Sequence, residues 1–554
     1  MLVRQQRPAR AGIPGRSCEI SEQTTLRKDA GTLGLLYVSV GSIVGSGWLF
    51  APMQAARQAG ALSIGSWLIG AAVVLLMALV YSELGTLIPR SGALVHISSI
   101  SHGRLVGIIW TWMMLLSYIT VPPLEVMAAV TYANDYVHGL IDPGSGLLTN
   151  LGLAVCIVLL GLVVALNFLV IRRVLLINDA VTWWKLAIPA STVIVLAFAS
   201  YHPENLRLPA AAMQHDTSGM FTAVVTSGII FSYFGFRQAV SLAGETTAPA
   251  RNVPLAVIGS VFIALLLYLG LQFAFMLAVQ PAELARGGWQ GLRFEGYTGS
   301  FAAVAVAAGA TWWAAVLYIN AIVSPAGTAL ISVTLCSRVT MATGEIGAGP
   351  RALMRLNADG VPWVALVVIF VMGALSFLPF PSWRKLVSYM SSLAVLSYGI
   401  GPIVLLQLRR VVPHIERPFR LRAASLVAPT AFIASNWIVS WSGLATLNIL
   451  FEILLGVFAL YLLFHYVFAM TGAHGPLGWA HAWWLLPYFA GLWLITALGP
   501  PAAGGDGTLT LFESMGVNAV FSMIILWIAL ATTVPDAEAR RVFHNFVRPV
   551  AEGR

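Results

Sequence analysis

The sequence predicts an all-α polytopic membrane protein, and three observations support this prediction. Of its 554 residues 58% are hydrophobic and only 10% are charged, whereas about 25% of the residues in soluble globular proteins are charged. The mean hydropathy is +0.83. Apolar runs of about 20 residues, each long enough for a helix to cross a bilayer, recur along the chain. A transmembrane β-barrel would instead show short strands of alternating polarity.

Apolar segments bounded by charged residues, Pro or Gly predict about fourteen membrane-spanning helices. Only length and the Ser442-Gly443 pair separate the eleventh segment from the twelfth. The segments are 31–58, 61–88, 105–133, 147–170, 178–199, 217–242, 253–279, 300–336, 361–379, 386–407, 424–441, 445–470, 482–499 and 515–534.

The distribution of basic residues predicts the orientation of these segments. Membrane proteins keep most of their Lys and Arg in cytoplasmic loops. With the N-terminus inside, most of the 31 Lys and Arg fall on the inner side. The predicted outer loops hold only Arg57, Arg207, Arg286, Arg293, Arg384 and Lys385. The net charge of +9 is therefore a topology signal and implies no nucleic-acid partner. We expect both termini to be cytoplasmic and the membrane to be a bacterial inner membrane.

Two of the segments are predicted to be interrupted helices. The first contains Gly41-Ser-Ile-Val-Gly-Ser-Gly47, and three glycines and two serines within seven residues are poor helix formers. The sixth contains Phe231-Ser-Tyr-Phe-Gly-Phe-Arg237, with a charge in the middle of the span. Irregular backbone at membrane depth is tolerated only where it is buried in protein or lines a water-filled cavity. The alternative for Gly41 and Gly45 is a close-packing helix face.

Paired interruptions in corresponding halves of a chain indicate the binding site of a secondary transporter. Segments one and six are the positions that a five-plus-five inverted repeat requires. The repeat is inferred here from position alone, because the two halves show no visible sequence similarity.

Five motifs now resemble those of the amino acid–polyamine–organocation (APC) superfamily of permeases. They are the two interruptions, Glu83-Leu-Gly-Thr-Leu-Ile-Pro-Arg-Ser-Gly92, Gly244-Glu-Thr-Thr-Ala-Pro-Ala-Arg-Asn-Val-Pro254 and Leu356-Asn-Ala-Asp-Gly-Val-Pro362. The resemblance implies the inverted-repeat transporter fold, with a ten-helix core at 31–410 and amino acid transport as the activity. Outside this core we expect four additional helices at 411–534 and cytoplasmic tails at 1–30 and 535–554. One departure is Arg237, where the superfamily often has an acidic residue.

The resemblance places the substrate at the two interruptions. An amino acid carboxylate suits the free N–H groups and positive dipole at a helix N-terminus, here within Val44–Trp48. The ammonium would meet carbonyls near Ser42 and Ile43 and within Phe231–Phe234. Phe231 resembles the superfamily's aromatic gate, and a core aromatic is the alternative role. The predicted substrate-binding residues are Ser42, Ile43, Gly45, Ser46, Gly47, Glu125, Phe231, Ser232, Phe234 and Arg237.

Lys185 is the predicted proton carrier. It lies within the fifth segment, and a cation in the middle of a membrane is costly and is by default a functional residue. Proton-driven members of the superfamily have a Lys at the matching position. A structural salt bridge is the alternative role for Lys185.

Arg237 and Glu125 are two further charged residues within spans. A guanidinium can hold a carboxylate through two parallel hydrogen bonds, so Arg237 is expected either to bind the side chain of aspartate or glutamate or to pair with Glu125. If Glu125 is not paired, it is a second candidate proton carrier. Glu83 and Glu245, near segment ends, are expected to anchor gates or loops.

The sequence therefore predicts a secondary active transporter that carries an amino acid, with acidic amino acids as expected substrates and protons as the driving ion. An amino acid exchanger of the same fold is the competing prediction, followed by a nutrient sensor. An integral membrane enzyme is a further alternative, but the sequence contains no Cys/His metal spacing, phosphate-binding loop or HExxH motif. No cofactor or metal is expected.

Overall fold

The chain folds into helices throughout the part that the computed structural model describes. The described residues are 31–88, 93–168, 171–207, 213–241, 243, 246, 248–285, 287–294, 296–357, 360–466 and 477–551. For 93–96, 171–181, 213–216 and 545–551 the description covers the backbone alone. The predicted N-terminal tail at 1–30 lies outside these residues, and so does Glu245.

The regular elements are α-helices joined by short 3₁₀ turns and loops. The helices are α1 (Thr32–Ile43), α2 (Gly47–Ala59), α3 (Ser63–Leu87), α4 (Ala93–Ile119), α5 (Val121–Ala133), α6 (Asn150–Leu166), α7 (Ile171–Ala199), α8 (Met213–Thr226), α9 (Ile229–Tyr233), α10 (Arg237–Ser241), α11 (Pro249–Ala278), α12 (Pro281–Leu284), α13 (Ser300–Ala307), α14 (Thr311–Glu345), α15 (Trp363–Ser376), α16 (Trp383–Tyr398), α17 (Ile400–Val411), α18 (Ala424–Trp441), α19 (Leu444–Tyr466), α20 (Leu485–Ala497), α21 (Leu511–Ala531) and α22 (Asp536–Ala551). The 3₁₀ turns used below are η3 (Phe234–Phe236) and η7 (Pro501–Ala503).

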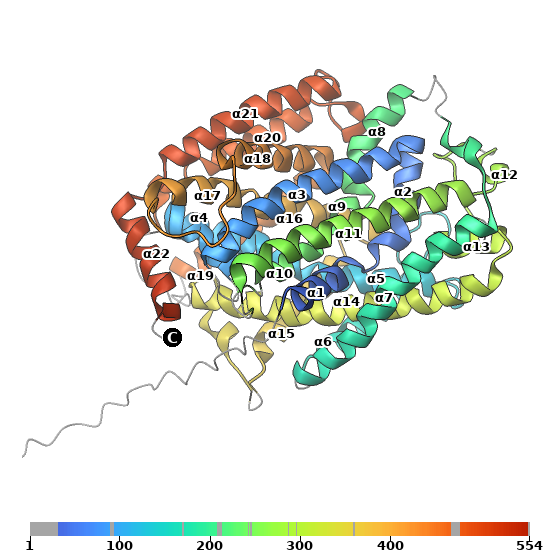
Figure 1. Cartoon of the computed structure of the whole chain (residues 1–554), viewed down its shortest axis with the longest axis horizontal. Coiled ribbons are helices and arrows are strands. Elements are labelled where there is room, and N and C mark those ends of the chain that lie inside the picture. Colours follow the sequence, from blue (N-terminus) through green and yellow to red (C-terminus); the bar gives the residue numbers. More distant parts are fainter. Residues whose placement is uncertain are drawn as a thin grey trace, which may run out of the picture.

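The long helices run roughly side by side along the long axis of the molecule (Figure 1). Within the described residues, eight helical stretches are long and apolar enough to cross a membrane, or up to nine if the bent pair formed by α8 and α9–α10 is one span. The polytopic membrane class is thus confirmed. Each of the fourteen predicted segments contains helix, but several are short. For example, the 12 residues of α1 extend only about 18 Å, less than the thickness of about 30 Å of the hydrocarbon core of a bilayer.

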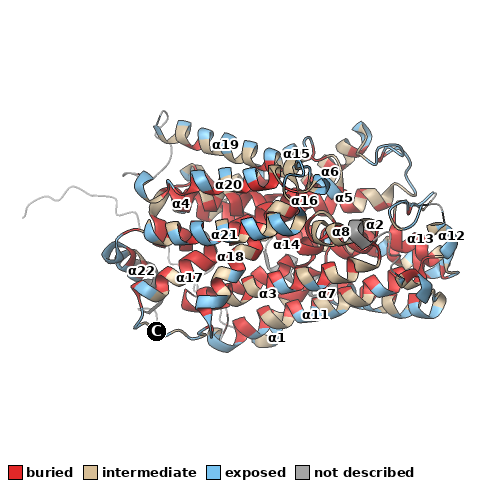
Figure 2. Cartoon of the chain, turned by 90° about the horizontal axis from the view of Figure 1, so that it is seen from above, coloured by how far each residue is buried: buried red, intermediate tan, exposed pale blue. Residues whose placement is uncertain are grey.

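The burial pattern also fits a lipid environment. The centre of the helix bundle is buried, while the outward faces of the peripheral helices are exposed (Figure 2). Large apolar side chains stand on these outward faces, including Trp527 on α21 at 72% exposure and Leu455 on α19 at 68%. Water-soluble monomers rarely expose apolar patches of this extent.

One predicted helix boundary is confirmed by the structure, and other helix boundaries were not evident from the sequence. The predicted split at Ser442-Gly443 is confirmed, because Gly443 has a φ of 89° between α18 and α19. The predicted segment 300–336 is instead two helices, α13 and α14. The predicted tail at 535–554 contains α22, which is tied to α17 by an ion pair of 3.4 Å between Arg410 and Asp536.

Candidate functional site

The first predicted interruption is present at residues 44–46. Helix α1 ends at Ile43, and α2 begins at Gly47. Val44 leaves the helical conformation with ψ at 89°, which frees backbone carbonyls at the end of α1 and exposes N–H groups at the start of α2. The serines and glycines of this stretch therefore form a helix break in the middle of a span, as predicted.

The second interruption differs in its position from the prediction. The predicted break at 231–237 contains the 3₁₀ turn η3, but the main bend, of 54°, lies upstream between α8 and α9. It is made at Gly228, whose φ is 85°, a conformation that glycine adopts most readily. This bend was not predicted, because the interruption was assigned to the motif that begins at Phe231.

The two interruptions are in direct contact with each other. A Cβ atom on Gly47 would overlap the Ser232 side chain, and one on Gly235 would overlap the Ile43 backbone. Tyr268 of α11 joins the same two elements, since its hydroxyl lies 3.1 Å from both the Ile43 and Ser232 carbonyl oxygens. A hydroxyl has one proton to donate, so at most one of these carbonyls is satisfied by Tyr268 at a time.

The side-chain carboxylate of Glu125, a residue of α5, lies at the start of α2. It is fully buried, and its Oε2 accepts a hydrogen bond of 2.9 Å from the Ser46 backbone N–H. Its other oxygen, Oε1, lies against Gly45 and accepts no hydrogen bond from a described residue. A protein carboxylate thus already binds at one of the N–H donors that the sequence analysis assigned to the substrate.

Lys185 of α7 lies on the other side of the same interruption. Its fully buried ammonium donates hydrogen bonds of 2.6 Å to the Gly41 carbonyl and 2.5 Å to Thr328 Oγ1. Lys185 and Glu125 are close enough to interact electrostatically but form no direct ion pair. Thr328 also lies beside Gly45, so it connects the surroundings of the two charged residues.

A small cavity lies between the interruptions. Its volume is about 20 Å³, room for about one water molecule. Arg237 lines it together with Glu125, but the two residues do not form an ion pair. The Arg237 guanidinium instead lies over the Tyr118 ring, 3.8 Å from the ring centroid, and its Nε and Nη1 have no acceptor among the described residues. The full lining is Ser42, Ile43, Val121, Glu125, Phe231, Phe234, Gly235, Arg237, Gln238, Thr328, Ser332 and Met390.

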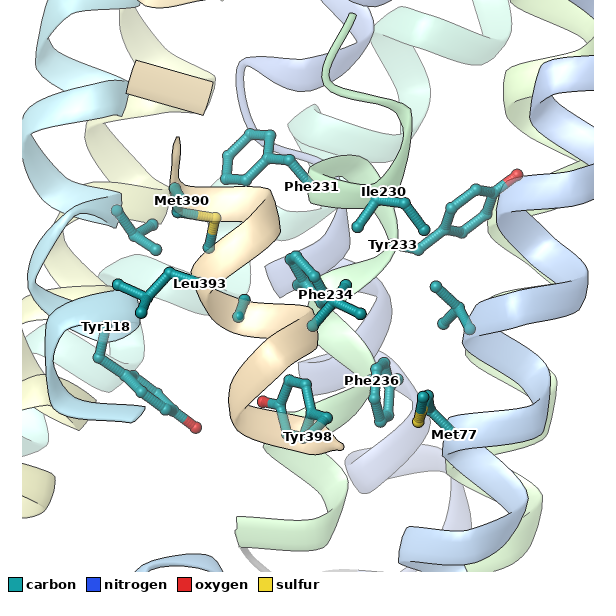
Figure 3. Packing of buried hydrophobic residues seen from close by; sticks show 14 of the residues in the cluster. Met77, Tyr118, Ile230, Phe231, Tyr233, Phe234, Phe236, Met390, Leu393 and Tyr398 are labelled. Carbon is teal, nitrogen blue, oxygen red and sulfur yellow. The ribbon is translucent and has the colours of Figure 1, made fainter. Parts of the chain in front are cut away.

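Aromatic side chains surround this cavity. In Figure 3, Phe231 and Phe234 project from the α9–η3 segment, Met390 and Tyr398 lie on α16, and Tyr118 lies near Tyr398. Three aromatic side chains, which we call the lid, contact one another at the α16 N-terminus: Phe50, Phe231 and Trp383. Of these, Phe231 also lines the cavity. Trp383 stacks on Phe50 with ring centroids 4.7 Å apart and meets Phe231 edge-on at 6.5 Å.

The lid is tied to the first interruption, because Trp383 Nε1 donates a hydrogen bond of 3.2 Å to Ser46 Oγ.

Six of the predicted site residues line the cavity, and the other five lie next to it. The lining residues are Ser42, Ile43, Glu125, Phe231, Phe234 and Arg237. The adjacent ones are Gly45, Ser46, Gly47, Lys185 and Ser232, which hold or pack the two interruptions. Four residues of the site were not predicted: Tyr268, Thr328, Trp383 and Gln238. For Tyr268, Thr328 and Gln238 the one available signal was a polar side chain within an apolar span.

Glu83 lies outside this site and holds the end of α3 to the loop after α17. Its buried carboxylate pairs with Arg409 at 2.5 Å and with Arg417 at 3.0 Å, and accepts a hydrogen bond of 2.7 Å from the Leu421 N–H. The predicted anchoring role fits these contacts. Among the described residues, no group of three or more His, Cys, Asp or Glu could hold a metal ion.

Several known amino acid transporters are similar to this chain over most of its length. The glutamate/serine transporter AimA of Bacillus subtilis is 33% identical over 508 residues, covering 90% of this chain and 93% of that protein. The aspartate-proton symporter of the same organism is 32% identical over 519 residues, covering 94% and 99%. The human Asc-type amino acid transporter 1 is 26% identical over 451 residues, covering 79% and 80%. The profile of the amino acid permease family matches residues 31–498, and the chain belongs to this family.

Proposed function

We propose that this permease is a secondary active transporter that carries acidic amino acids together with protons. The observation on which the proposal rests is the buried Arg237, whose Nε and Nη1 have no acceptor and which lines the cavity between the two interruptions. A buried cation of this kind suits a side-chain carboxylate. Two similar proteins, a glutamate/serine transporter and an aspartate-proton symporter, support the same substrate class.

The proposed substrate lies across the two interruptions. Its α-carboxylate binds the N-terminus of α2, where the Ser46 N–H and the first helical N–H groups point outward. Its ammonium binds whichever of the Ile43 and Ser232 carbonyls Tyr268 leaves free. Its side-chain carboxylate reaches Arg237. Because the cavity of about 20 Å³ is too small for an amino acid, binding requires α9–η3 or α16 to move outward.

Proton coupling is proposed to involve Glu125 and Lys185 as a pair. Neighbouring ionisable groups can titrate together rather than singly when they interact. When the Glu125 carboxylate is charged, it occupies the Ser46 N–H and repels a second carboxylate. A proton on Glu125 removes the repulsion and releases that donor to the substrate. Lys185 then supplies positive charge next to the bound carboxylate. One proton therefore favours binding of one anionic substrate.

The membrane organisation proposed for this chain follows the sequence prediction. Fourteen spans place a five-plus-five inverted-repeat core at 31–410, four further helices at 411–534 and both termini in the cytoplasm of a bacterial cell. The interruptions in α1–α2 and α8–α10 support the repeat, since they occur in the first and sixth segments. Alternating access then proceeds by rocking the interrupted helices against the rest of the bundle.

Uptake of labelled aspartate into proteoliposomes tests the proposal. With an inward proton gradient we expect accumulation that a protonophore abolishes and that excess glutamate blocks, whereas alanine competes poorly. Uptake that ignores the gradient but requires amino acid inside the vesicles would identify an exchanger instead. Competition by neutral amino acids alone would refute the assignment of Arg237 to an acidic side chain.

A further inference from the structure

A second cavity has Arg384, the residue that follows Trp383 of the lid, in its lining. Its volume is about 570 Å³, and its walls come from α2, α8, α16, α18, the start of α19 and η7. We call it the entry cavity. The lid residues lie on the same stretches of chain: Phe50 is on α2, Trp383 begins α16 directly before Arg384, and Phe231 is on α9, which follows α8. The same stretches of chain thus carry the walls of the entry cavity and the lid, and Phe231 of the lid also lines the small cavity between the interruptions.

The entry cavity is positively charged. Arg57 and Arg384 are in its lining. The positive charges of Arg384 and Arg293 are close enough to repel that of Arg57. None of these three arginines forms a hydrogen bond or ion pair with a described residue, and no carboxylate is among the lining residues that the structure describes. Like charges brought together without a counter-ion repel one another, so the site gains stability when an anion binds.

The polar lining suits a small zwitterionic anion rather than a bare ion. Gln54 and Gln58 present amide groups from α2, and Thr222 and Thr226 present hydroxyls from α8. Thr226 Oγ1 donates a hydrogen bond of 2.8 Å to Gln58 Oε1, which joins the two walls. An amino acid with two carboxylates and one ammonium could use both the guanidinium donors and the amide and hydroxyl oxygens.

We infer that the entry cavity is a second binding site, in which Arg57 and Arg384 hold an acidic amino acid before the lid opens. The inference rests on the proposed function, because it takes aspartate or glutamate as the substrate. It also agrees with the predicted topology, which places all three arginines on the outer side. Charge of one sign at the mouth of a cleft raises the local concentration and association rate of an oppositely charged ligand by 10-fold or more.

The C-terminal helices supply part of the wall of the entry cavity. One wall of the entry cavity consists of Trp441, Ser442 and Gly443 at the end of α18, with Ala502, Ala503 and Gly504 at η7. These residues belong to the four helices beyond the predicted ten-helix core. Arg57 is half-buried and Arg384 is exposed, so without this wall a ligand at the two arginines would be held from one side only. The added helices thus form one side of the entry cavity.

Cysteine labelling of purified protein in detergent tests the charge of the site independently of transport. Gln54→Cys, in a background with Cys18, Cys156 and Cys336 replaced by serine, places a thiol in the lining. We expect an anionic methanethiosulfonate to react about 10-fold faster than a cationic one. With Arg57→Gln and Arg384→Gln added, the labelling rates of the anionic and the cationic reagent should differ by no more than about twofold. Lys385→Gln, an exposed neighbour outside the lining, is the matched control and should retain the difference.

Ligand protection identifies what the site binds. Millimolar aspartate should slow the labelling of Gln54→Cys, and inorganic phosphate at the same concentration should not. Equal protection by phosphate, or by an anionic phospholipid added to the detergent, would overturn the inference of an amino acid site. Equal labelling rates for the two reagents before any arginine is changed would overturn its electrostatic basis.

Transport then connects the site to function. In proteoliposomes the Arg57→Gln/Arg384→Gln variant should show a several-fold higher KM for aspartate at low ionic strength, with kcat unchanged. The salt dependence of that KM should largely disappear. An unchanged KM would overturn the entry role. If the unmodified protein transports no aspartate although labelling and protection behave as expected, the proposed function fails and the anion site stands.

Discussion

The Glu125→Gln variant is the most direct test of whether the charge on Glu125 controls substrate binding. Glutamine keeps the size of the side chain, and its neutral carbonyl oxygen competes less strongly than the carboxylate for the Ser46 N–H, which now donates to Oε2 at 2.9 Å. What it lacks is the negative charge. In our proposal, the charge on Glu125 keeps the substrate carboxylate away from the N-terminus of α2 until a proton arrives. The variant should therefore bind aspartate as if it were permanently protonated.

The contacts set the magnitude of this effect. A hydrogen bond to a charged group contributes about 1.5–3 kcal/mol, and 1.4 kcal/mol corresponds to a tenfold change in Kd. Competition for the Ser46 N–H alone should thus weaken aspartate binding about 10- to 100-fold when Glu125 is ionised. Direct repulsion between two carboxylates, about 4 kcal/mol at 4 Å for an effective dielectric constant of 20, acts in the same direction.

Equilibrium binding of labelled aspartate to purified protein, measured from pH 5 to pH 8, is the assay. For the unmodified protein, affinity should rise as the pH falls, because the protonated form of Glu125 is the binding form. The Glu125→Gln variant should bind tightly at every pH in this range. If the variant keeps a steep pH dependence, or if acidification does not strengthen binding to the unmodified protein, Glu125 is not the proton site.

Four further changes test other parts of the site. Lys185→Ala should abolish proton-driven accumulation of aspartate without preventing folding, and unchanged proton dependence would remove Lys185 from the mechanism. Arg237→Ala should shift preference away from acidic substrates in a competition assay, and a variant that still prefers aspartate to alanine would show that another residue selects the substrate. Glu83→Gln leaves two arginines without their buried partner and should lower the free energy of unfolding by about 3–5 kcal/mol, so a thermal midpoint equal to that of the unmodified protein in detergent would contradict the anchoring role. Gly235→Ala puts a methyl group against the Ile43 backbone and should destabilise the protein by about 1–3 kcal/mol and reduce uptake, which normal uptake at normal expression would disprove.

Composition and local motifs predicted the class of the protein and the position of the first interruption. The reason is physical: a lipid environment requires long apolar segments, and an unwound segment requires residues such as Gly45 and Ser46 that form helix poorly. Local signals failed at the second interruption. The prediction placed the break in the motif that begins at Phe231, whereas the bend lies at Gly228. Local signals also failed at 308–310, where an apolar Ala-Gly-Ala run separates α13 from α14 with no charge to mark it.

The contacts of the site were less predictable than its location. That Arg237 and Glu125 line one cavity without forming an ion pair depends on the rotation of α5 relative to α10, which sequence spacing does not determine. Tyr268 is a tyrosine in an apolar helix, where packing against other aromatics is its usual role. Only the structure shows its hydroxyl against the carbonyls of both interruptions.

The arrangement of these contacts explains how a proton could drive a large movement. Gly47 against Ser232, Gly235 against Ile43 and the Tyr268 hydroxyl fasten the two interruptions into one unit. Packed interfaces of this kind switch between discrete arrangements rather than deforming gradually. Glu125, Lys185 and Thr328 come from α5, α7 and α14 and reach this unit from outside it.

The charged pair therefore lies at the joint between the interrupted helices and the helices around them. Two of its hydrogen bonds cross that joint: one from the Ser46 N–H to Glu125 and one from Lys185 to the Gly41 carbonyl. A proton that weakens the first bond changes the relative stability of two positions of the whole unit, because a bound species shifts an equilibrium only by its differential affinity for the two states. In the proposed mechanism, coupling needs no long pathway, since the proton and the substrate act on the same few backbone atoms.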